Sequence, residues 1–259
     1  MEFKLSLSGI ERQEELLRFV EQHQRATVTE MAEYLSVSLA TVRRDLESLT
    51  EQGKIQRFHG GAIAVPKAPP ELPALERETE QAEHKKRIGR AAAELVEAGD
   101  TIFLGSGTTV LEVARNLRQH RRLTVITNSL PVINILTDVP EINMVCLGGI
   151  LRRSELSMIG HITEQALAEV VADKVIMGIR ALDVERGLTN DYLPETKTDR
   201  SILGIGRKVI IVADHTKCGR VSTAFVAPIT AIQTLVTDSN TSPDFIGHLT
   251  AKGIEVVTV

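Results

Sequence analysis

The sequence of 259 residues contains little cysteine, no excess of positive charge and no long apolar run. Its two cysteines, Cys146 and Cys218, lie far apart and outside any Cys-x-x-Cys or histidine-rich pattern. This usage is typical of a reducing compartment, so we expect both cysteines in the core and no structural metal. No apolar run approaches the roughly 18 residues needed to cross a membrane, and the N-terminus lacks the pattern of a signal peptide. We therefore expect a soluble, cytoplasmic protein with no membrane partner.

The charge balance excludes a second class of protein. A net charge of -4 argues against a generally basic protein that coats nucleic acid. Residues 1–65 themselves carry 8 Lys/Arg and 10 Asp/Glu, so any affinity for DNA there has to come from a local patch. At roughly 100–200 residues per domain, the length favours two domains.

Residues 10–65 have the apolar spacing of a compact helical unit. The positions that define its first two helices are Ile10, Leu16, Leu17 and Val20, then Met31, Ala32 and Leu35. Thr27 and Glu30 have the spacing of a capping box at the start of the second helix. Ser38 is suited to N-cap a third helix, in which Val42, Leu46 and Leu49 recur at i, i+4 and i+7 and face inward.

Basic side chains follow on the outer face of the third helix and beyond it. Gly53 ends this helix, and residues 54–58 and 62–65 are predicted to form two strands joined through His59-Gly60-Gly61. The whole pattern predicts a winged helix-turn-helix. Arg43 and Arg44 point about 100° apart on a helix, so one can reach bases in the major groove while the other binds phosphate.

The wing is expected to approach the DNA backbone or the minor groove. Asp45 is expected to orient an arginine or a helix terminus, because phosphates repel a carboxylate. The alternative for the charged run is a solvated helix face, which the adjacent cap and basic wing disfavour. The predicted DNA-binding residues are Ser38, Thr41, Arg43, Arg44, Lys54, Arg57, His59 and Gly60.

A second domain is predicted beyond a proline-rich segment. The domains are residues 1–65 and 82–259, and residues 66–81, with four prolines, form a semi-rigid linker. Apolar runs then alternate with helical patterns, and the expected strands are 101–104, 123–127, 143–147, 174–178, 208–213, 234–237 and 255–259. Continuous Val/Ile/Leu runs indicate strands buried on both faces, so we expect an α/β fold with a mainly parallel sheet.

Loops after these strands are candidates for a ligand pocket, since ligands bind beyond the carboxyl edge of parallel sheets. The first loop, Gly105-Ser106-Gly107-Thr108-Thr109, opens a helix and is suited to bind an anion, although a plain tight turn is the alternative. It matches neither the Walker A nor the Gly-x-Gly-x-x-Gly spacing, which disfavours nucleotide hydrolysis and dinucleotide binding. Further candidates are Asn128, Ser129, Gly148, Gly149, Arg152 and Gly178. The alternatives are a helix cap for Asn128, a plain turn for the Gly148-Gly149 pair and a solvated side chain for Arg152.

The motifs resemble those of the DeoR family of bacterial transcriptional regulators. The matching stretches are Val37-Ser38, residues 41–46, residues 59–62, residues 105–109, residues 127–129, Gly148-Gly149 and residues 214–219. The resemblance covers nearly the whole chain. It implies a C-terminal domain related to ribose-5-phosphate isomerase, a phosphorylated sugar metabolite as effector, and a homodimer or homotetramer. It also implies double-stranded operator DNA as partner and repression of a carbohydrate operon.

Lys217 matches the lysine of the family's Asp-x-Ser-Lys-x-Gly pattern, which implies that it binds the effector's phosphate. His215 and Thr216 depart from that pattern and put the neighbouring contacts in doubt. Asp214 is expected to be a turn or capping residue. The polar stretch 180–200 is interpreted as a loop that shapes selectivity or a subunit contact, and the alternative is a solvated loop and helix start.

Two other functions are weighed. An isomerase needs a carboxylate base and a cation, and Asp183 and Glu195 supply carboxylates, but the isomerase's glycine-rich lysine segment has no counterpart between Gly178 and Arg200. We therefore expect no enzyme and no cofactor. A ligand-free architectural DNA-binding protein would leave the glycine loops unexplained. An activator that responds to the same ligand stays open.

Overall fold

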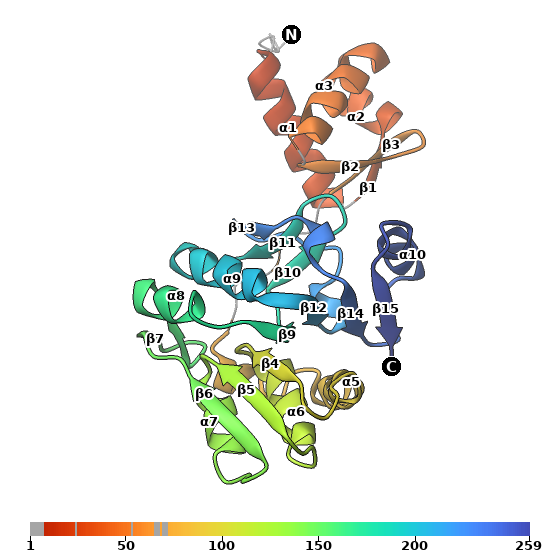
Figure 1. The fold of residues 1–259 in the computed structure, drawn as a ribbon. Coiled ribbons are helices and arrows are strands. Elements are labelled where there is room, and N and C mark those ends of the chain that lie inside the picture. Colours follow the sequence, from red (N-terminus) through yellow and green to blue (C-terminus); the bar gives the residue numbers. More distant parts are fainter. Residues whose placement is uncertain (1–7, 24, 53, 65–67, 69–71) are drawn as a thin grey trace. The chain divides into compact units, whose positions relative to one another are not determined.

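The computed structural model describes residues 8–23, 25–52, 54–64, 68 and 72–259. The chain divides into two compact units, Met1–Lys67 and Ala68–Val259, here called the N-terminal and C-terminal units. In Figure 1 the N-terminal unit is coloured red to orange, and the C-terminal unit runs from yellow to blue. Each unit has its own apolar core.

The N-terminal unit is a winged helix-turn-helix (Figure 1). Its elements are α1 (Gly9–His23), β1 (Arg25–Thr27), α2 (Val28–Leu35), α3 (Leu39–Glu51), β2 (Ile55–Phe58) and β3 (Gly61–Ala64). The three strands form an antiparallel sheet in the order β1-β3-β2. The sequence pattern missed β1, because a strand of three residues is too short to show alternation and exists here by pairing with β3.

The predicted helix caps of this unit are confirmed. Thr27 and Glu30 form a capping box at α2, and the Oγ of Ser38 accepts a hydrogen bond from the backbone N–H of Thr41 at 3.1 Å. Ile10 does not belong to the buried face, since it lies in the first turn of α1 and is 75% exposed. Gly53, the predicted end of the third helix, lies outside the described residues, and the C-cap of α3 is Gln52.

A seven-stranded parallel sheet forms the centre of the C-terminal unit, in the order β15-β14-β12-β9-β4-β5-β6 (Figure 1). The strands are β4 (Thr101–Leu104), β5 (Leu123–Thr127), β6 (Ile142–Cys146), β9 (Ala172–Met177), β12 (Gly206–Val212), β14 (Thr234–Thr237) and β15 (Glu255–Thr258). Three helices cover each face. Helices α5 (Ala82–Glu94), α6 (Thr108–Leu117) and α7 (Leu130–Leu136) contribute to one core, and α8 (His161–Leu167), α9 (Leu193–Ile205) and α10 (Pro243–Ala251) to the other.

The strand order has a direct consequence for function. From β4 the chain builds the sheet outward through β5 and β6, and it then returns to the other side of β4 with β9, β12, β14 and β15. The order therefore reverses between β4 and β9. In open parallel sheets such a switch point leaves a crevice beyond the carboxyl ends of the two strands, because the loops that follow them turn to opposite faces.

All seven predicted long strands are present, with bounds that differ by no more than two residues. Smaller antiparallel elements were not predicted: a hairpin of β7 (Ile150–Arg152) and β8 (Ser157–Ile159), and a sheet of β10 (Ala181–Asp183), β11 (Gly187–Asn190) and β13 (Ala224–Ala227). Of the alternative interpretation of residues 180–200, a solvated loop and helix start, the helix start is confirmed, since α9 begins at Leu193, but the solvated loop is wrong. This stretch contains β10, β11 and the first half of α9, and burial of its polar side chains makes it part of the folded core.

The structure also departs from two further expectations. The segment expected as linker includes α4 (Ala74–Arg77), which belongs to the C-terminal unit and has Ala74 and Arg77 buried. Cys146 is exposed, because it ends the edge strand β6, and Cys218 is only partly buried. Two short 3-10 helices, η1 (His215–Lys217) and η2 (Ile229–Ala231), complete the described elements. No helix among the described residues combines the length and the apolar character needed to cross a membrane.

Candidate DNA interface and ligand cavity

The third helix of the N-terminal unit presents two arginines to solvent. Arg43 and Arg44 on α3 are exposed, while Val42, Leu46 and Leu49 on its other side are buried in the core of the unit. Such a division leaves the outer face of α3 free to contact another molecule. Thr41 is partly buried and lies at the start of the same helix, where its side chain hydrogen-bonds with Ser38.

Asp45, on the buried face of α3, links this helix to α1. Its carboxylate is 3% exposed and accepts two hydrogen bonds from Arg12 on α1, from Nε at 2.6 Å and from Nη2 at 3.0 Å. The prediction that Asp45 orients an arginine is confirmed, although the arginine is Arg12 rather than Arg43 or Arg44. This bidentate ion pair connects α1 to α3 and thereby fixes the angle at which α3 is presented.

The wing carries the remaining predicted DNA-binding residues. Lys54, Arg57, His59 and Gly60 are all exposed. Gly60 has φ of +94°, which favours glycine, and a Cβ on Gly61 would lie 2.2 Å from the backbone oxygen of Ala26. The turn between β2 and β3 therefore depends on both glycines. One basic residue was missed: exposed Arg25 on β1 places its guanidinium 4.1 Å from the ring centroid of Phe58.

A polar cavity occupies the switch point of the C-terminal unit. It lies beyond the carboxyl ends of β4, β5, β9 and β12 and also receives side chains from α4, α5, β11 and α9. Most of the predicted ligand residues line this cavity. They are Gly105, Ser106, Gly107, Thr108, Thr109, Asn128, Arg152, Gly178 and Lys217. The convergence of loops that are far apart in the sequence follows from the parallel sheet, because all its strands end at one edge.

Three predicted ligand residues do not line this cavity: Ser129, Gly148 and Gly149. Ser129 is instead the N-cap of α7. A Cβ on Gly149 would lie 2.0 Å from the Oγ1 of Thr163, and the carbonyl of Gly148 accepts a hydrogen bond from the same hydroxyl at 2.8 Å. The two glycines thus allow close packing against α8. They follow β6, which is two strands away from β4, so their loop lies off the switch point.

The loop after β4 presents the start of a helix to the cavity. Gly107 has φ of +108° and is the N-cap of α6, and among the described residues no side chain caps this helix. The first backbone N–H groups of an α-helix have no partner within the helix, and the helix dipole places partial positive charge there. Thr108 and Thr109 add hydroxyl groups to the same wall.

Basic side chains surround this loop. Lys217 reaches the cavity from η1, and Lys85, which sequence reasoning missed, reaches it from α5. Lys85 is 5% exposed and donates to the carbonyl of Arg77 at 2.7 Å, and burial lowers the pKa of its ammonium group. Asp214 lines the same wall and caps η1, because its Oδ1 accepts the backbone N–H of Thr216 at 2.9 Å, as predicted for a capping residue.

Carboxylates form the opposite wall of the cavity. Glu195 and Asp199 on α9 are buried, and the side-chain amide of Asn190 donates to both, at 3.1 Å and 2.9 Å. Arg152 forms an ion pair with Glu195. Burial, followed by repulsion from Asp199, raises the pKa of Glu195 to about 7, and burial raises the pKa of Asp199 to about 6. Both carboxyl groups therefore hold their protons to higher pH than exposed carboxyl groups do.

Asn128 contributes an unused acceptor to the cavity. Its side chain is 3% exposed and donates through Nδ2 to the carbonyl of Met158 at 2.8 Å. Its Oδ1 has no hydrogen-bond partner within the described part of the chain. A buried acceptor without a partner is energetically unfavourable. A ligand hydroxyl that donates a hydrogen bond to it would remove this cost and so strengthen ligand binding.

The buried carboxylates predict how stability depends on pH. Because the pKa of Glu195 in the folded protein lies above its ordinary value of 4.5, its contribution is complete below about pH 4.5 and is lost as the pH rises through about 7. Glu195→Gln is expected to remove this loss, which is on the order of 3 kcal/mol in total. Urea unfolding of both proteins between about pH 5 and pH 8 measures it, with exposed Glu94→Gln as control. Parallel pH profiles for wild type and Glu195→Gln would contradict the shift.

Comparison with known proteins agrees with both units. Residues 12–68 match the family described as "DeoR-like helix-turn-helix domain", and residues 80–239 match "DeoR C terminal sensor domain". The chain is 34% identical over 229 residues to the glycerol-3-phosphate regulon repressor of Escherichia coli (strain K12), covering 88% of this chain and 90% of that protein. It is 33% identical over 232 residues to the transcriptional repressor AccR of Agrobacterium fabrum, covering 89% and 90%.

Similar solved structures include ribose 5-phosphate isomerase A from Methanocaldococcus jannaschii. That likeness has 20% identity and a TM-score of 0.39, over 54% of this chain and 55% of the other. The sorbitol operon regulator SorC from Klebsiella pneumoniae has 12% identity and a TM-score of 0.38, over 98% and 97%. The two family matches together span most of the chain, in the same order as the two folded units. This protein therefore belongs to the DeoR family of DNA-binding transcriptional regulators.

Proposed function

We propose that this protein represses a carbohydrate operon and releases its operator when a phosphorylated sugar binds in the cavity of the C-terminal unit. The observation that carries this proposal is the division of the cavity into a cationic wall around the uncapped start of α6 and a wall of hydrogen-bond acceptors on α9. A phosphosugar has the same division, with an anionic group at one end and hydroxyl groups along the rest.

The phosphate is assigned to the loop after β4. Backbone N–H groups at the start of α6 donate to phosphate oxygens, and the hydroxyl groups of Thr108 and Thr109 lie at the same wall. Lys217 supplies a positive charge from η1. Gly107, with its positive φ, allows the chain to turn into α6 without a side chain that would occupy the space of the phosphate.

The sugar is assigned to the opposite wall. Glu195 and Asp199 accept hydrogen bonds from hydroxyl groups, and Asn128 offers its unused Oδ1. Arg152, which is paired with Glu195, holds that carboxylate in place. An unphosphorylated sugar would satisfy these acceptors but bring no anionic group to the cationic wall, so we expect the phosphate to dominate affinity.

The operator is assigned to the N-terminal unit. The exposed arginines of α3 enter the major groove, and the wing residues Lys54, Arg57 and His59 contact the backbone or the minor groove. Two or more subunits, as a homodimer or homotetramer, would place one recognition helix in each half-site. The chain's negative net charge supports a local interface of this kind rather than general affinity for DNA.

We assign the coupling between the two sites to α4, the first helix of the C-terminal unit. Arg77 at its end lines the cavity, forms a buried ion pair with Glu155, and donates through Nε to the carbonyl of Leu72 at 2.8 Å. The backbone N–H of Ala74 donates to the backbone carbonyl of Ser154 at 2.8 Å. A ligand that contacts Arg77 more favourably in the released state than in the operator-bound state would favour the released state. The change would involve the segment that follows the N-terminal unit in the chain.

The first experiment is a thermal-shift screen of the purified protein against phosphorylated sugars and their unphosphorylated parents. A ligand that binds only the folded state raises the melting temperature, by an amount that grows with its concentration. We expect a shift with a phosphosugar and none with its parent. The same compound should release a labelled operator fragment, and in cells it should raise transcription from that operator. Lower transcription would identify an activator, and no shift with any phosphosugar would contradict the assigned effector class.

Lys217→Ala is expected to make the regulator much less sensitive to its effector. Loss of the ammonium group removes a charge-assisted hydrogen bond to phosphate, which is worth about 1.5–3 kcal/mol, or roughly a 10- to 150-fold loss of effector affinity. Operator binding should stay within about twofold of wild type. Effector titrations of the operator complex measure both values. Exposed Lys86→Ala on α5 is the control, and a Lys217→Ala protein that responds fully would rule out Lys217 as the phosphate partner.

A further inference from the structure

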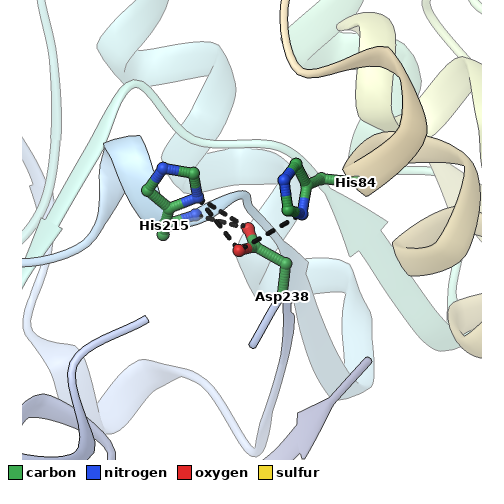
Figure 2. Close-up of side chains that lie close together, drawn as sticks. All are labelled: His84, His215 and Asp238. Atoms are coloured by element: carbon green, nitrogen blue, oxygen red, sulfur yellow. Dashed lines mark hydrogen bonds and ion pairs between the residues drawn. The ribbon is translucent and has the colours of Figure 1, made fainter. Parts of the chain in front are cut away.

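Two histidines and an aspartate from three separate elements meet beside the cavity (Figure 2). His84 lies on α5, His215 begins η1, and Asp238 directly follows β14. The Nδ1 of His215 lies 2.9 Å from the Oδ1 of Asp238, and the Nδ1 of His84 lies 3.4 Å from the same oxygen. One ligand atom from each of the three residues can be chosen so that all lie within 4.8 Å of one another.

The carboxylate of this cluster is held rigidly. The side chain of Asp238 is 0% exposed, and its Oδ2 accepts the backbone N–H of His215 at 2.8 Å. Its Oδ1 accepts the backbone N–H of Asn240 at 3.0 Å. Each oxygen retains lone-pair capacity for another partner, because an ionised carboxylate offers about four acceptor sites. Asp238 is therefore a preorganised, charged acceptor that faces two imidazole rings.

We propose that His84, His215 and Asp238 bind a divalent transition-metal ion of the Zn²⁺ type. Two imidazole nitrogens and one carboxylate oxygen form a common protein donor set for such ions, with an open position for water or a ligand. Bonds of 2.0–2.1 Å in a tetrahedral site place ligand atoms roughly 3.3 Å apart. The two separations from Asp238, 2.9 Å and 3.4 Å, bracket this value, and the three ligand atoms all lie within 4.8 Å of one another.

The surroundings of the histidines suit a metal better than a simple hydrogen-bonded pair. One histidine is enough to pair with Asp238, yet a second ring approaches edge-on, with ring centroids 5.5 Å apart. The side-chain amide of Asn240 lies 3.5 Å from the Nε2 of His84, where a ligating imidazole carries its outward N–H group. Arg87 donates to the Nδ1 of His84 at 2.9 Å, and being exposed, it can turn to solvent when a metal occupies that nitrogen.

The metal site is separate from the effector cavity but lies next to it. Residue His215 is followed directly in η1 by Thr216 and Lys217, and His84 is followed in α5 by Lys85; all three neighbours line the cavity. A bound ion would therefore clamp η1 to α5 and fix the positions of two lysines at the cationic wall. Metal binding itself requires neither phosphosugar nor operator, so its test is independent of the proposed function.

The test is a Zn²⁺ titration of the metal-free full-length protein by calorimetry, followed by metal analysis after gel filtration. We expect one equivalent per chain, and an affinity at least about 100-fold weaker in His84→Ala and in His215→Ala, since even second-shell changes cost about 10- to 100-fold. Exposed His248→Ala on α10 is the matched control and should bind like wild type. A wild type that binds no Zn²⁺, or histidine variants that bind it unchanged, would overturn the proposal.

Two further measurements separate lost ligation from lost folding. Asp238→Asn keeps the shape of the side chain, and His84→Gln keeps a polar group on the partly exposed α5. Both should fold in metal-free buffer, as judged by circular dichroism, and should still fail to bind Zn²⁺. X-ray absorption of the loaded wild type should show nitrogen and oxygen ligands alone. A sulfur ligand would instead place the metal at Cys146 or Cys218 and contradict the assigned donor set.

Discussion

Replacing Arg43 and Arg44 together by alanine is expected to weaken operator binding by at least about 30-fold. Each arginine that contacts a base edge or a phosphate contributes about 1–3 kcal/mol, and each factor of ten costs about 1.4 kcal/mol. The effect is large because both side chains are exposed on α3, whose opposite face is buried in the core of the N-terminal unit. Fluorescence anisotropy with a labelled operator fragment at several salt concentrations measures it.

The salt series also separates the two arginines. The single variant that lost a phosphate contact should reduce the slope of log K against log salt by about one, whereas the variant that lost a base contact should lose sequence discrimination. Arg18→Ala on α1 is the matched control, since it removes an exposed arginine of the same unit that pairs with Glu15. Effector-induced stabilisation should persist in all these variants. If the Arg43→Ala, Arg44→Ala double variant bound the operator as wild type does, α3 would not be the recognition helix.

Arg77→Ala is expected to destabilise the C-terminal unit by about 3–5 kcal/mol. Its guanidinium lies 2.5 Å and 2.6 Å from the two carboxylate oxygens of Glu155, and both side chains are at most 10% exposed. Removal of one partner from a buried ion pair is strongly destabilising, because the other charge stays buried and loses its closest opposite charge. For a domain of this size, a loss of about 3 kcal/mol lowers the melting temperature by roughly 6–12 °C. Differential scanning calorimetry measures it directly.

A second variant distinguishes stability from coupling. Replacing both residues, as Arg77→Met with Glu155→Leu, removes both charges and should recover most of the stability, because apolar side chains can pack where a buried ion pair stood. It should not recover effector-dependent release of the operator if α4 couples the sites. Arg90→Ala, which removes an exposed pair with Glu94, should cost less than about 1 kcal/mol. Full effector response in the double variant would exclude α4 as the coupling element.

Local patterns were sufficient to predict most of the fold. The capping box of Thr27 and Glu30 and the N-cap at Ser38 are short-range hydrogen bonds between residues three apart, so they are visible in the sequence. The long strands were found because burial on both faces of the sheet requires continuous apolar runs. The short strands β7, β8, β10, β11 and β13 carry no such run and depend on pairing with distant partners.

The ligand cavity was predicted only in outline. Position after a strand indicates the edge of the sheet at which a loop lies, and on that basis Asn128, Gly178 and Lys217 were placed correctly at the cavity wall. It does not indicate how far that strand lies from the switch point, which is why Gly148 and Gly149 were expected at a cavity that they do not line. The roles of Lys85 and Arg77 were missed because both residues belong to a charged segment that resembles a solvated linker and helix.

The sequence by itself determined the winged helix, the parallel sheet and the family, because each depends on residue types at short, regular spacing. Only the tertiary structure decided which charges are buried and which residues meet. Arg77 and Glu155 are 78 residues apart in the chain, and His84 and Asp238 approach within 3.4 Å from α5 and the end of β14. Such contacts are set by the order of strands in the sheet and by the packing of helices on it, and neither quantity is encoded at short range.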